Sequence, residues 1–136
     1  MDNNLKTILV IEDEKKIVEF IESYLISSNY KVYKAMTGHD ALKLFNSEKI
    51  DLVLLDLILP DISGEQICKE LRKKSKVPII MLTAKTQEES IINGLNIGAD
   101  DYITKPFSPR QLIARVKVLL RRTENEIYNS DILAFN

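Results

Sequence analysis

Short apolar runs alternate five times along the chain with segments whose apolar residues recur at helical spacing. The runs are expected to form strands at Thr7–Glu12, Lys31–Ala35, Asp51–Asp56, Pro78–Leu82 and Asp101–Thr104. Strands that alternate with helices in this way are typical of a parallel sheet with helices on both faces. The third and fourth runs are almost continuously apolar, as expected of central strands that are covered on both sides. The pattern therefore predicts an α/β fold.

The segment between the first two expected strands has a single apolar stripe. Its apolar residues stand at i, i+3, i+4, i+7 and i+8, and they are Ile17, Phe20, Ile21, Tyr24 and Leu25. Because residues at this spacing share one face of a helix, we expect all of them to pack against the sheet. The segment is thus predicted to be a crossover helix.

Later helices have start signals in which a hydroxyl side chain is followed three residues on by Gln or Glu. These pairs are Ser63 with Gln66, Thr86 with Glu89, and Ser108 with Gln111. Pro109 adds a favourable first helical residue to the last pair. Gly98 is expected to end the fourth helix in a left-handed conformation, and a shorter second helix is predicted near Asp40–Phe45.

The character of the chain changes after Arg122. Thr123–Asn136 is polar at first and then has a few apolar residues with no evident packing partner. We expect one folded domain over residues 1–122. Residues 123–136 are predicted to be a linker and the first strand of a missing output domain.

Composition excludes several classes of function. Lysine and arginine total 19 against 20 acids, so this chain has no basic excess with which to hold a nucleic-acid backbone. No apolar run approaches membrane-spanning length, and the first residues lack the features of an export signal, so we expect the protein in the cytoplasm. The single cysteine, Cys68, cannot form an internal disulfide and is interpreted as helix packing.

Unusual side chains stand where the expected strands end. The acids Glu12 and Asp13 close the first strand and Asp56 closes the third, while Thr83 follows the fourth and Lys105 the fifth. Each alone also fits a helix cap or an exposed side chain. In open parallel sheets, however, ligands bind outside the carboxyl ends of the strands. With a flavodoxin-like strand order of 2-1-3-4-5 the first and third strands are neighbours, so the three carboxylates are expected to converge.

Converging carboxylates raise one another's pKa and destabilise a fold unless a cation neutralises them. A hard divalent cation with oxygen ligands does so, and Mg²⁺ is the usual choice where phosphate is also held. The ring of Pro106 forces Lys105 into an extended conformation that aims its cationic side chain over the strand ends. Thr86 is better placed than Thr83 to begin the next helix, which assigns the Thr83 hydroxyl to the site.

These residues and their spacing resemble the receiver domains of two-component response regulators. The resemblance runs from about Lys6 to Arg122. It rests on the ordered segments Ile8–Glu14, Asp51–Pro60, Pro78–Ala84 and Gly98–Phe107. It implies a doubly wound, flavodoxin-like (βα)5 sheet of order 2-1-3-4-5, with residues 1–122 as a phosphoacceptor receiver domain.

The resemblance implies a role for each acid of the site. Asp56 is the phosphoacceptor, and it binds Mg²⁺ together with Glu12 and Asp13, directly or through water. The backbone carbonyl of Ile58 completes the metal site. The donor is a phosphohistidine on a sensor histidine kinase or relay protein, and hydrolysis of the acyl phosphate restores Asp56. The domain is thus expected to be a regulatory phosphoacceptor that catalyses only its own turnover.

The resemblance also implies what surrounds the phosphoryl group. Thr83 and Lys105 contact its oxygens, and the Lys105–Pro106 peptide is in the cis form. Phosphorylation pulls on the Thr83 hydroxyl and shifts the loop after the fourth strand. Tyr102 then turns inward as the switch aromatic.

Within the family, the segment from Asp100 onward resembles the winged-helix transcription-factor subgroup. Members of that subgroup dimerise through the fourth helix, fifth strand and fifth helix when phosphorylated, and their output domain binds DNA. The residues that match their intersubunit ion pairs are Asp100, Asp101, Arg115 and Arg122. One pair is missing, because the usual basic residue on the fourth helix is replaced by Ile91 and its acidic partner by Gln111.

Three other functions are compatible with parts of this pattern. A haloacid dehalogenase-type phosphatase has a second Asp two residues after the nucleophile, on the first strand, whereas here Ile58 occupies that position on the third. A flavin-binding module needs a glycine- and hydroxyl-rich loop after the first strand, where Glu12 and Asp13 would repel phosphate. A docking domain that is never phosphorylated is disfavoured by the complete set of site residues. His39 has no acid placed to orient it in the sequence and is interpreted as a solvated residue.

Overall fold

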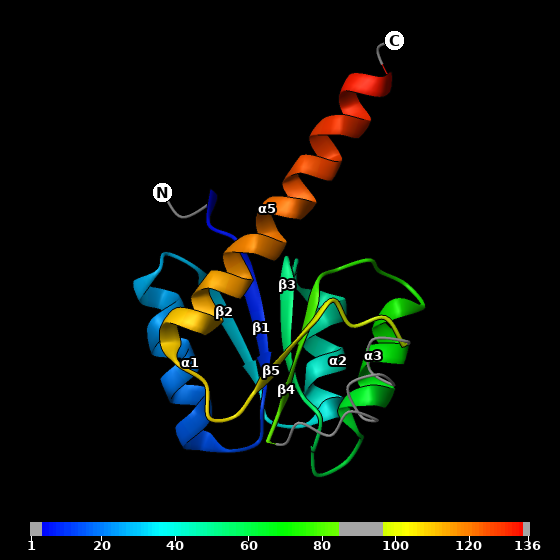
Figure 1. The fold of residues 1–136 in the computed structure, drawn as a ribbon. Helices are drawn as coiled ribbons and strands as arrows, with labels where there is room; N and C mark the ends of the chain where they lie inside the picture. Colours follow the sequence, from blue (N-terminus) through cyan, green and yellow to red (C-terminus); the bar gives the residue numbers. More distant parts are fainter. Residues whose placement is uncertain (1–3, 85–96, 135–136) are drawn as a thin grey trace.

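The computed structural model describes residues 4–84 and 97–134, with side chains described as far as Glu124 in the last helix. The elements in these ranges are β1 (Thr7–Ile11), α1 (Lys15–Ser27), β2 (Lys31–Ala35), α2 (Gly38–Ser47), β3 (Leu52–Asp56), α3 (Gly64–Arg72), β4 (Ile79–Thr83), β5 (Asp101–Thr104) and α5 (Pro109–Ala134) (Figure 1). The helix predicted from Thr86 and Glu89 lies outside the described residues. Gly98 has the positive φ, 122°, that was expected after that helix.

The strands form one parallel sheet in the order β2-β1-β3-β4-β5. This order confirms the predicted fold class. The register places Ile11 of β1 beside Leu55 of β3, and Asp56 beside Leu82 of β4. Since the strands are parallel and in step, their carboxyl ends share one edge of the sheet. The predicted strand bounds differ from the observed ones by at most one residue.

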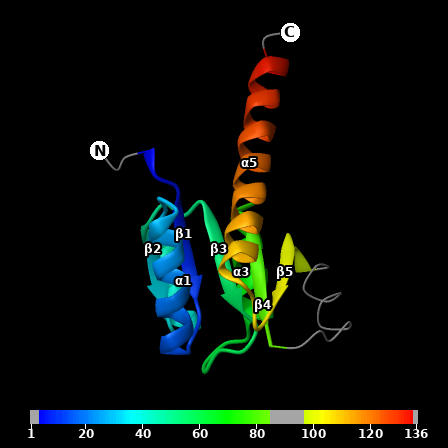
Figure 2. The same cartoon turned by 60° about the vertical axis from the view of Figure 1, so that its left-hand side comes forward.

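Helices cover both faces of the sheet, with α1 and α5 on one face and α2 and α3 on the other (Figures 1 and 2). Ile8 and Val10 of β1 belong to the buried cluster under α1 and α5, whereas Leu9 and Ile11 belong to the cluster under α2 and α3. Alternate residues of a strand point to opposite faces, so a strand covered on both faces has no polar side. This explains why β1, β3 and β4 are buried throughout.

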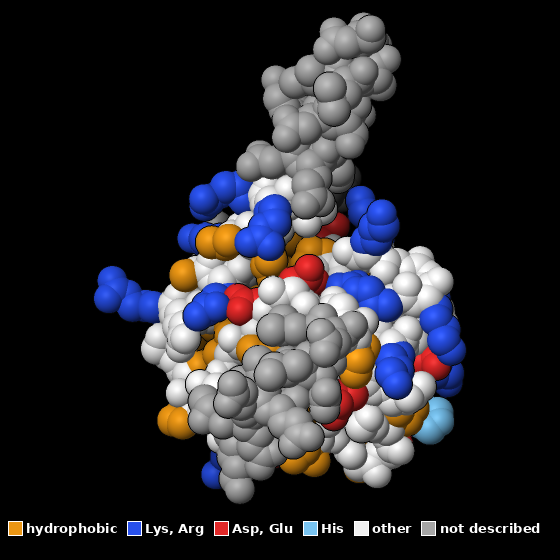
Figure 3. Space-filling model, turned by 45° about the vertical axis from the view of Figure 1, so that its right-hand side comes forward, with side chains coloured by type: hydrophobic (Ala, Val, Ile, Leu, Met, Phe, Trp, Pro, Cys, Tyr) orange, Lys and Arg blue, Asp and Glu red, His pale blue; other side chains and the backbone are white. Residues whose placement is uncertain are grey.

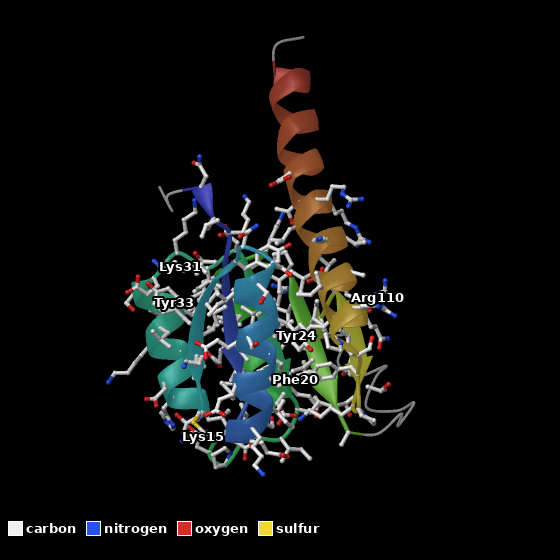
Figure 4. The ribbon with its side chains drawn as sticks, turned by 90° about the vertical axis from the view of Figure 1, so that its left-hand side faces the viewer. Lys15, Phe20, Tyr24, Lys31, Tyr33 and Arg110 are labelled. Atoms are coloured by element: carbon white, nitrogen blue, oxygen red, sulfur yellow. The ribbon has the colours of Figure 1, made fainter. Side chains whose placement is uncertain are left out.

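The apolar stripe of α1 is only partly buried, so the prediction for this helix was wrong in two positions. Ile21 and Leu25 are buried as expected, but Phe20 and Tyr24 are 40% and 41% exposed. Figure 4 shows both residues at the side of α1 that faces α5. Each lies roughly 100° around the helix from Ile21 or Leu25, at the margin of the arc that contacts the sheet. Their rings instead pack on each other, with centroids 5.1 Å apart.

The predicted start signals of α3 and α5 are formed in part. The Ser63 Oγ accepts the backbone N–H of Gln66 at 3.1 Å, and the Ser108 Oγ accepts that of Gln111 at 3.0 Å. The side chain of Gln66 donates to Glu70 at 3.2 Å and does not accept the N–H of Ser63, as the reciprocal bond of a capping box would require. Each serine therefore caps its helix, and in α3 the reciprocal half of the capping box is replaced by an i,i+4 contact.

The last helix is longer than the sequence predicted. Residues 123–134, expected to form a linker and a strand, continue α5 to Ala134. No glycine or proline follows Pro109 in this segment, so nothing in the backbone interrupts the helical hydrogen bonds. Figure 1 shows α5 running past the edge at which the strands begin, where Glu124 forms an ion pair with Lys6 at 3.6 Å. Among the described residues, no helix is both long and apolar enough to cross a membrane.

Candidate functional site

Buried polar side chains gather at the carboxyl edge of the sheet. Asp56 is the last residue of β3 and Thr83 the last of β4, while Glu12 follows β1, held by a hydrogen bond from its N–H to the Ala35 carbonyl. Glu12, Asp56 and Thr83 are 0%, 6% and 7% exposed. Strands made of apolar residues thus end in polar groups that point away from solvent, and this placement calls for a function.

Three carboxylates meet at this edge, as the sequence predicted. Oxygens of Glu12, Asp13 and Asp56 all lie within 4.8 Å of one another, and Asp13 is the exposed member of the group. The three residues come from two neighbouring strands whose register is fixed by the sheet. The donor atoms are all oxygen, which suits a hard cation such as Mg²⁺. Neither Cys68 nor His39 belongs to the group, so the residues present fit Mg²⁺ rather than a softer metal.

Lys105 lies over the acids. Its Nζ is 2.6 Å from an oxygen of Glu12 and 3.6 Å from an oxygen of Asp56. Its side chain is 16% exposed, and its backbone N–H donates to the carbonyl of Thr83 at 2.6 Å. The Lys105–Pro106 peptide is cis, as the family resemblance implied. The sheet therefore brings together the residues that the sequence assigned to the site.

The charges of the site are not balanced by these residues alone. Burial raises the pKa of Glu12, and the nearby Asp56 adds to the rise, although the hydrogen bond from Lys105 opposes it. Burial by itself would lower the pKa of Lys105, but its contacts with Glu12 and Asp56 raise that pKa. The group has three acids, and Lys105 contacts two of them, so additional positive charge at this edge would stabilise the ionised acids.

The loop after β3 leaves the site along a tightly packed path. A Cβ on Gly64 would lie 2.3 Å from the Asp56 carbonyl oxygen, so only glycine allows α3 to begin this close to the strand. The Gly64 N–H donates to the carbonyl of Leu57 at 2.9 Å. Ile58 follows Leu57 in this loop, and its side chain is 74% exposed. The Ile58 N–H donates to Oδ1 of Asp56 at 3.4 Å. The backbone at Ile58, the expected metal ligand, therefore borders the carboxylates.

Tyr102 is half-buried in the middle of β5 and packs against the cluster under α2 and α3. Burial raises the pKa of its hydroxyl, and the negative charge of Glu65 contributes. Its strand neighbour in the sheet is Met81 of β4. Tyr102 therefore lies on the strand next to β4, and Thr83 of the site is the last residue of β4.

The residues predicted to form a dimer interface are partly engaged within the chain. Arg115 contacts both oxygens of Asp101, at 2.8 and 2.9 Å, and Asp100 pairs with Arg72 of α3 at 2.9 Å. Figure 3 shows acidic and basic side chains side by side on this face. Gln111 and Arg122 line the same shallow pocket as Asp100, Asp101 and Arg115. Ile91 lies outside the described residues.

Two residues with long-range roles were missed by the sequence analysis. Asp61 accepts hydrogen bonds from the start of α2 and lies 2.5 Å from Nδ1 of His39, so the statement that no acid is placed to orient His39 was wrong. The ring is nevertheless exposed, as expected. Arg72 donates to the carbonyls of Val77 and Gly98 as well as to Asp100. Neither residue belongs to a periodic pattern, and no sequence signal identifies its partners.

Comparison with known proteins gives the family. The model of the response regulator receiver domain family matches residues 8–117. A receiver domain protein of Methanospirillum hungatei, described as CheY-like, is 32% identical, with a TM-score of 0.86, over 90% of this chain and 99% of its own. The receiver domain of the Francisella response regulator 1452 is 39% identical, with a TM-score of 0.83, over 87% and 98%. The chain belongs to the response regulator receiver domain family and acts in two-component signalling.

One similar structure extends beyond a receiver domain. DrrB of Thermotoga maritima, described as an OmpR/PhoB homologue, is 38% identical with a TM-score of 0.81. The match covers 88% of this chain but 54% of DrrB. Receiver domains interact with histidine kinases and bind Mg²⁺ at an acidic pocket, and Glu12, Asp13 and Asp56 form such a group here.

Proposed function

We propose that Asp56 accepts a phosphoryl group from a phosphohistidine of a sensor histidine kinase. The observation that carries this proposal is the position of the Asp56 carboxylate, which ends β3 among two further acids with Lys105 Nζ at 3.6 Å. The domain is then a regulatory phosphoacceptor, and the only reactions it catalyses are its own phosphorylation and dephosphorylation. It is not an enzyme that acts on other substrates.

The transfer is an in-line displacement at phosphorus. A carboxylate oxygen of Asp56 forms the new P–O bond while the N–P bond of the phosphohistidine breaks and leaves its electron pair on the imidazole nitrogen. Such a transition state needs mainly positioning and charge neutralisation. Lys105 is already held over Asp56 by Glu12 and reaches a phosphoryl oxygen from there, and the Thr83 hydroxyl donates to another. Attack of water at phosphorus later breaks the bond to Asp56 and releases phosphate.

Glu12, Asp13 and Asp56, with the carbonyl of Ile58, would hold Mg²⁺ at this edge. When bound, Mg²⁺ supplies positive charge to the carboxylates and phosphoryl oxygens. The raised pKa of Glu12 agrees with this assignment, because burial, and then the nearby Asp56, disfavour an ionised carboxylate that a cation would stabilise.

Phosphorylation would reach the rest of the domain through Thr83 and Tyr102. A phosphoryl group adds about 1.5 to 2 negative charges and strong hydrogen-bond acceptors. We propose that these attract the Thr83 hydroxyl, which shifts the loop after β4 and lets Tyr102 turn further inward. The half-buried position of Tyr102 on the neighbouring strand supports this route.

We further propose that the activated domain dimerises through the fourth helix, β5 and α5, and that an attached DNA-binding output domain then regulates transcription. The likeness to DrrB supports this extension. In a two-fold dimer each Asp101 would exchange the Arg115 of its own chain for that of the second copy. The pair is open to this exchange, because the Arg115 side chain is 43% exposed. We expect Asp100 to contribute less to the dimer than Asp101, since Arg72 of the same chain already holds it.

Intact-mass measurement tests the central step. Incubation with phosphoramidate and Mg²⁺ is expected to add one phosphoryl group to the wild-type chain and none to Asp56→Asn. Asp51→Asn is the matched control, since it changes an acid at the other end of the same strand and should still be labelled. Labelling of Asp56→Asn, or of neither protein, would contradict the assignment. Circular dichroism would check that both variants remain folded.

A further inference from the structure

The start of α2 is held by an acid from another segment. Asp61 lies in the loop between β3 and α3, and its Oδ1 accepts the N–H of Gly38 at 2.8 Å while its Oδ2 accepts that of His39 at 2.9 Å. The first N–H groups of a helix have no partner within the helix. The usual cap, Thr37, serves Asp40 instead, at 3.1 Å. Asp61 therefore supplies half of the capping of a helix that is remote in sequence.

The contact between the loop and α2 is close and directional. A Cβ on Gly38 would lie 2.8 Å from Cδ1 of Ile67 and 3.0 Å from Cβ of Ile62, so the helix begins directly against the loop and α3. The imidazole Nδ1 of His39 adds a third contact to the Asp61 carboxylate at 2.5 Å. These backbone and side-chain hydrogen bonds hold the pKa of Asp61 well below its usual range. The acid is therefore ionised, and its interactions persist, across the physiological range of pH.

The contact of Asp61 with α2 anchors one end of a short loop segment, residues 57–61, which borders the proposed phosphorylation site. The other end is Leu57, whose carbonyl accepts the N–H of Gly64 at 2.9 Å and whose backbone packs against that glycine. Between the two anchors the side chain of Ile58 is 74% exposed, so its own packing cannot fix the position of its carbonyl. The path of the backbone at Ile58 must instead be set by the anchored residues on either side.

We propose that Asp61 is a positioning residue for the metal site: by fastening the β3–α3 loop to the start of α2, it holds the Ile58 carbonyl in reach of a cation bound by the acidic edge. The inference rests on the proposed function, since it takes Ile58 as a metal ligand. His39 reinforces the anchor through its ring but is secondary, because the backbone N–H groups of Gly38 and His39 remain when the ring is removed.

An acid with a purely structural role offers the matched control. Asp51 accepts the N–H of Thr7 at 2.7 Å and fastens the beginning of β3 to β1, at the edge away from the site. Asp61→Ala and Asp51→Ala both remove a carboxylate that accepts backbone hydrogen bonds. Both variants are therefore expected to lose stability without metal, and only Asp61→Ala should also lose affinity for Mg²⁺.

The experiment is urea unfolding over a series of Mg²⁺ concentrations, since the gain in unfolding free energy gives the dissociation constant by linkage. We expect Asp61→Ala to weaken Mg²⁺ binding about tenfold, the low end of what outer partners of metal ligands contribute. His39→Ala should weaken it less and Asp51→Ala not at all. The Mg²⁺ concentration that half-saturates labelling by phosphoramidate should rise in parallel, with little change in the rate at saturation.

The outcomes separate this inference from the proposed function. If wild-type chain is neither stabilised by Mg²⁺ nor labelled, the proposed function fails. If wild type responds and Asp61→Ala has the same Mg²⁺ dissociation constant, Asp61 is only a helix cap and the inference is overturned. Should Asp61→Ala not fold, Asp61→Asn serves, because its amide oxygen can still accept from Gly38 while its NH₂ group cannot accept from His39. An unchanged dissociation constant in that variant is equally decisive.

Discussion

The two edges of the sheet use the same kinds of side chain in different ways. At the edge where the strands begin, Asp51 and Asp100 have partners that satisfy them. Asp51 accepts the N–H of Thr7 at 2.7 Å, and Asp100 accepts that of Ile79 at 2.8 Å while pairing with Arg72. A carboxylate with backbone donors and a guanidinium is satisfied in the folded chain, so this edge fastens loops and helices together.

At the edge where the strands end, the acids face one another. Glu12 and Asp56 are buried, and Lys105 is the cation that contacts them among the described residues. Burial and the neighbouring charge raise the pKa of Glu12, so the ionised site lowers stability until a cation is added. The edge where the strands begin thus stabilises the fold, and the edge where they end holds the acidic site.

We expect the largest effect on unfolding free energy from a substitution at the edge where the strands begin. Arg72→Ala removes donors from the carbonyls of Val77 and Gly98 and leaves Asp100 without its cation. We expect a loss of about 2–3 kcal/mol of unfolding free energy, measured in urea. The increment of stability from Mg²⁺ should stay the same. Arg121→Ala, an exposed arginine of α5, should cost less than about 0.5 kcal/mol, and an equal loss in both variants would remove Arg72 from this role.

The second prediction concerns Mg²⁺ at the edge where the strands end. A cation that binds only the folded chain, at tenfold its dissociation constant, stabilises it by about 1.4 kcal/mol. The melting temperature should then rise by roughly 5 °C for a domain of this size. Asp13→Ala should lose most of this shift in thermal unfolding. Asp51→Ala should melt at a lower temperature but keep the full rise on addition of Mg²⁺. An equal rise in wild type and Asp13→Ala would show that the two edges do not differ in this way.

A smaller effect is expected from pH. The pKa of Glu12 in the folded chain is raised above its ordinary value of 4.5, so folding favours the protonated form. The stability that Glu12 contributes is therefore present below pH 4.5 and lost as pH rises through the raised pKa. In buffer without Mg²⁺, the unfolding free energy of wild type should fall more than that of Glu12→Gln as the pH increases through this range. Parallel curves of unfolding free energy against pH for the two proteins would show that the ionised Glu12 does not destabilise the fold.

The smallest effect is expected in the dimer interface, because exposed ion pairs contribute only about 0–1 kcal/mol each. Sedimentation of the chain activated with beryllium fluoride should show dimers of wild type and monomers of Asp101→Arg or Arg115→Glu. Mixing these two variants restores both pairs between the copies while the pairs within each chain stay broken. Recovery of a dimer in the mixture supports the exchange of partners, and a mixture that stays monomeric would exclude it.

The sequence by itself determined the fold and the members of the site. The apolar strands β3 and β4, the helical spacing of α1 and the residues at the strand ends are local patterns. In a parallel sheet, residues at successive strand ends must meet at one edge. That rule places Glu12 beside Asp56 without any knowledge of side-chain packing, and the structure agrees.

Only the tertiary structure decided which side chains pair across the molecule. His39 and Asp61 are 22 residues apart, and Arg72 and Asp100 are 28 apart, so neither contact follows from a helical or strand period. The exposure of Phe20 depends on the arc of α1 that meets the sheet, and that arc is set by how the helix docks. Local periodicity fixes which face of an element is apolar, but the docking of elements against one another fixes the width of the buried arc and the partners of each polar group.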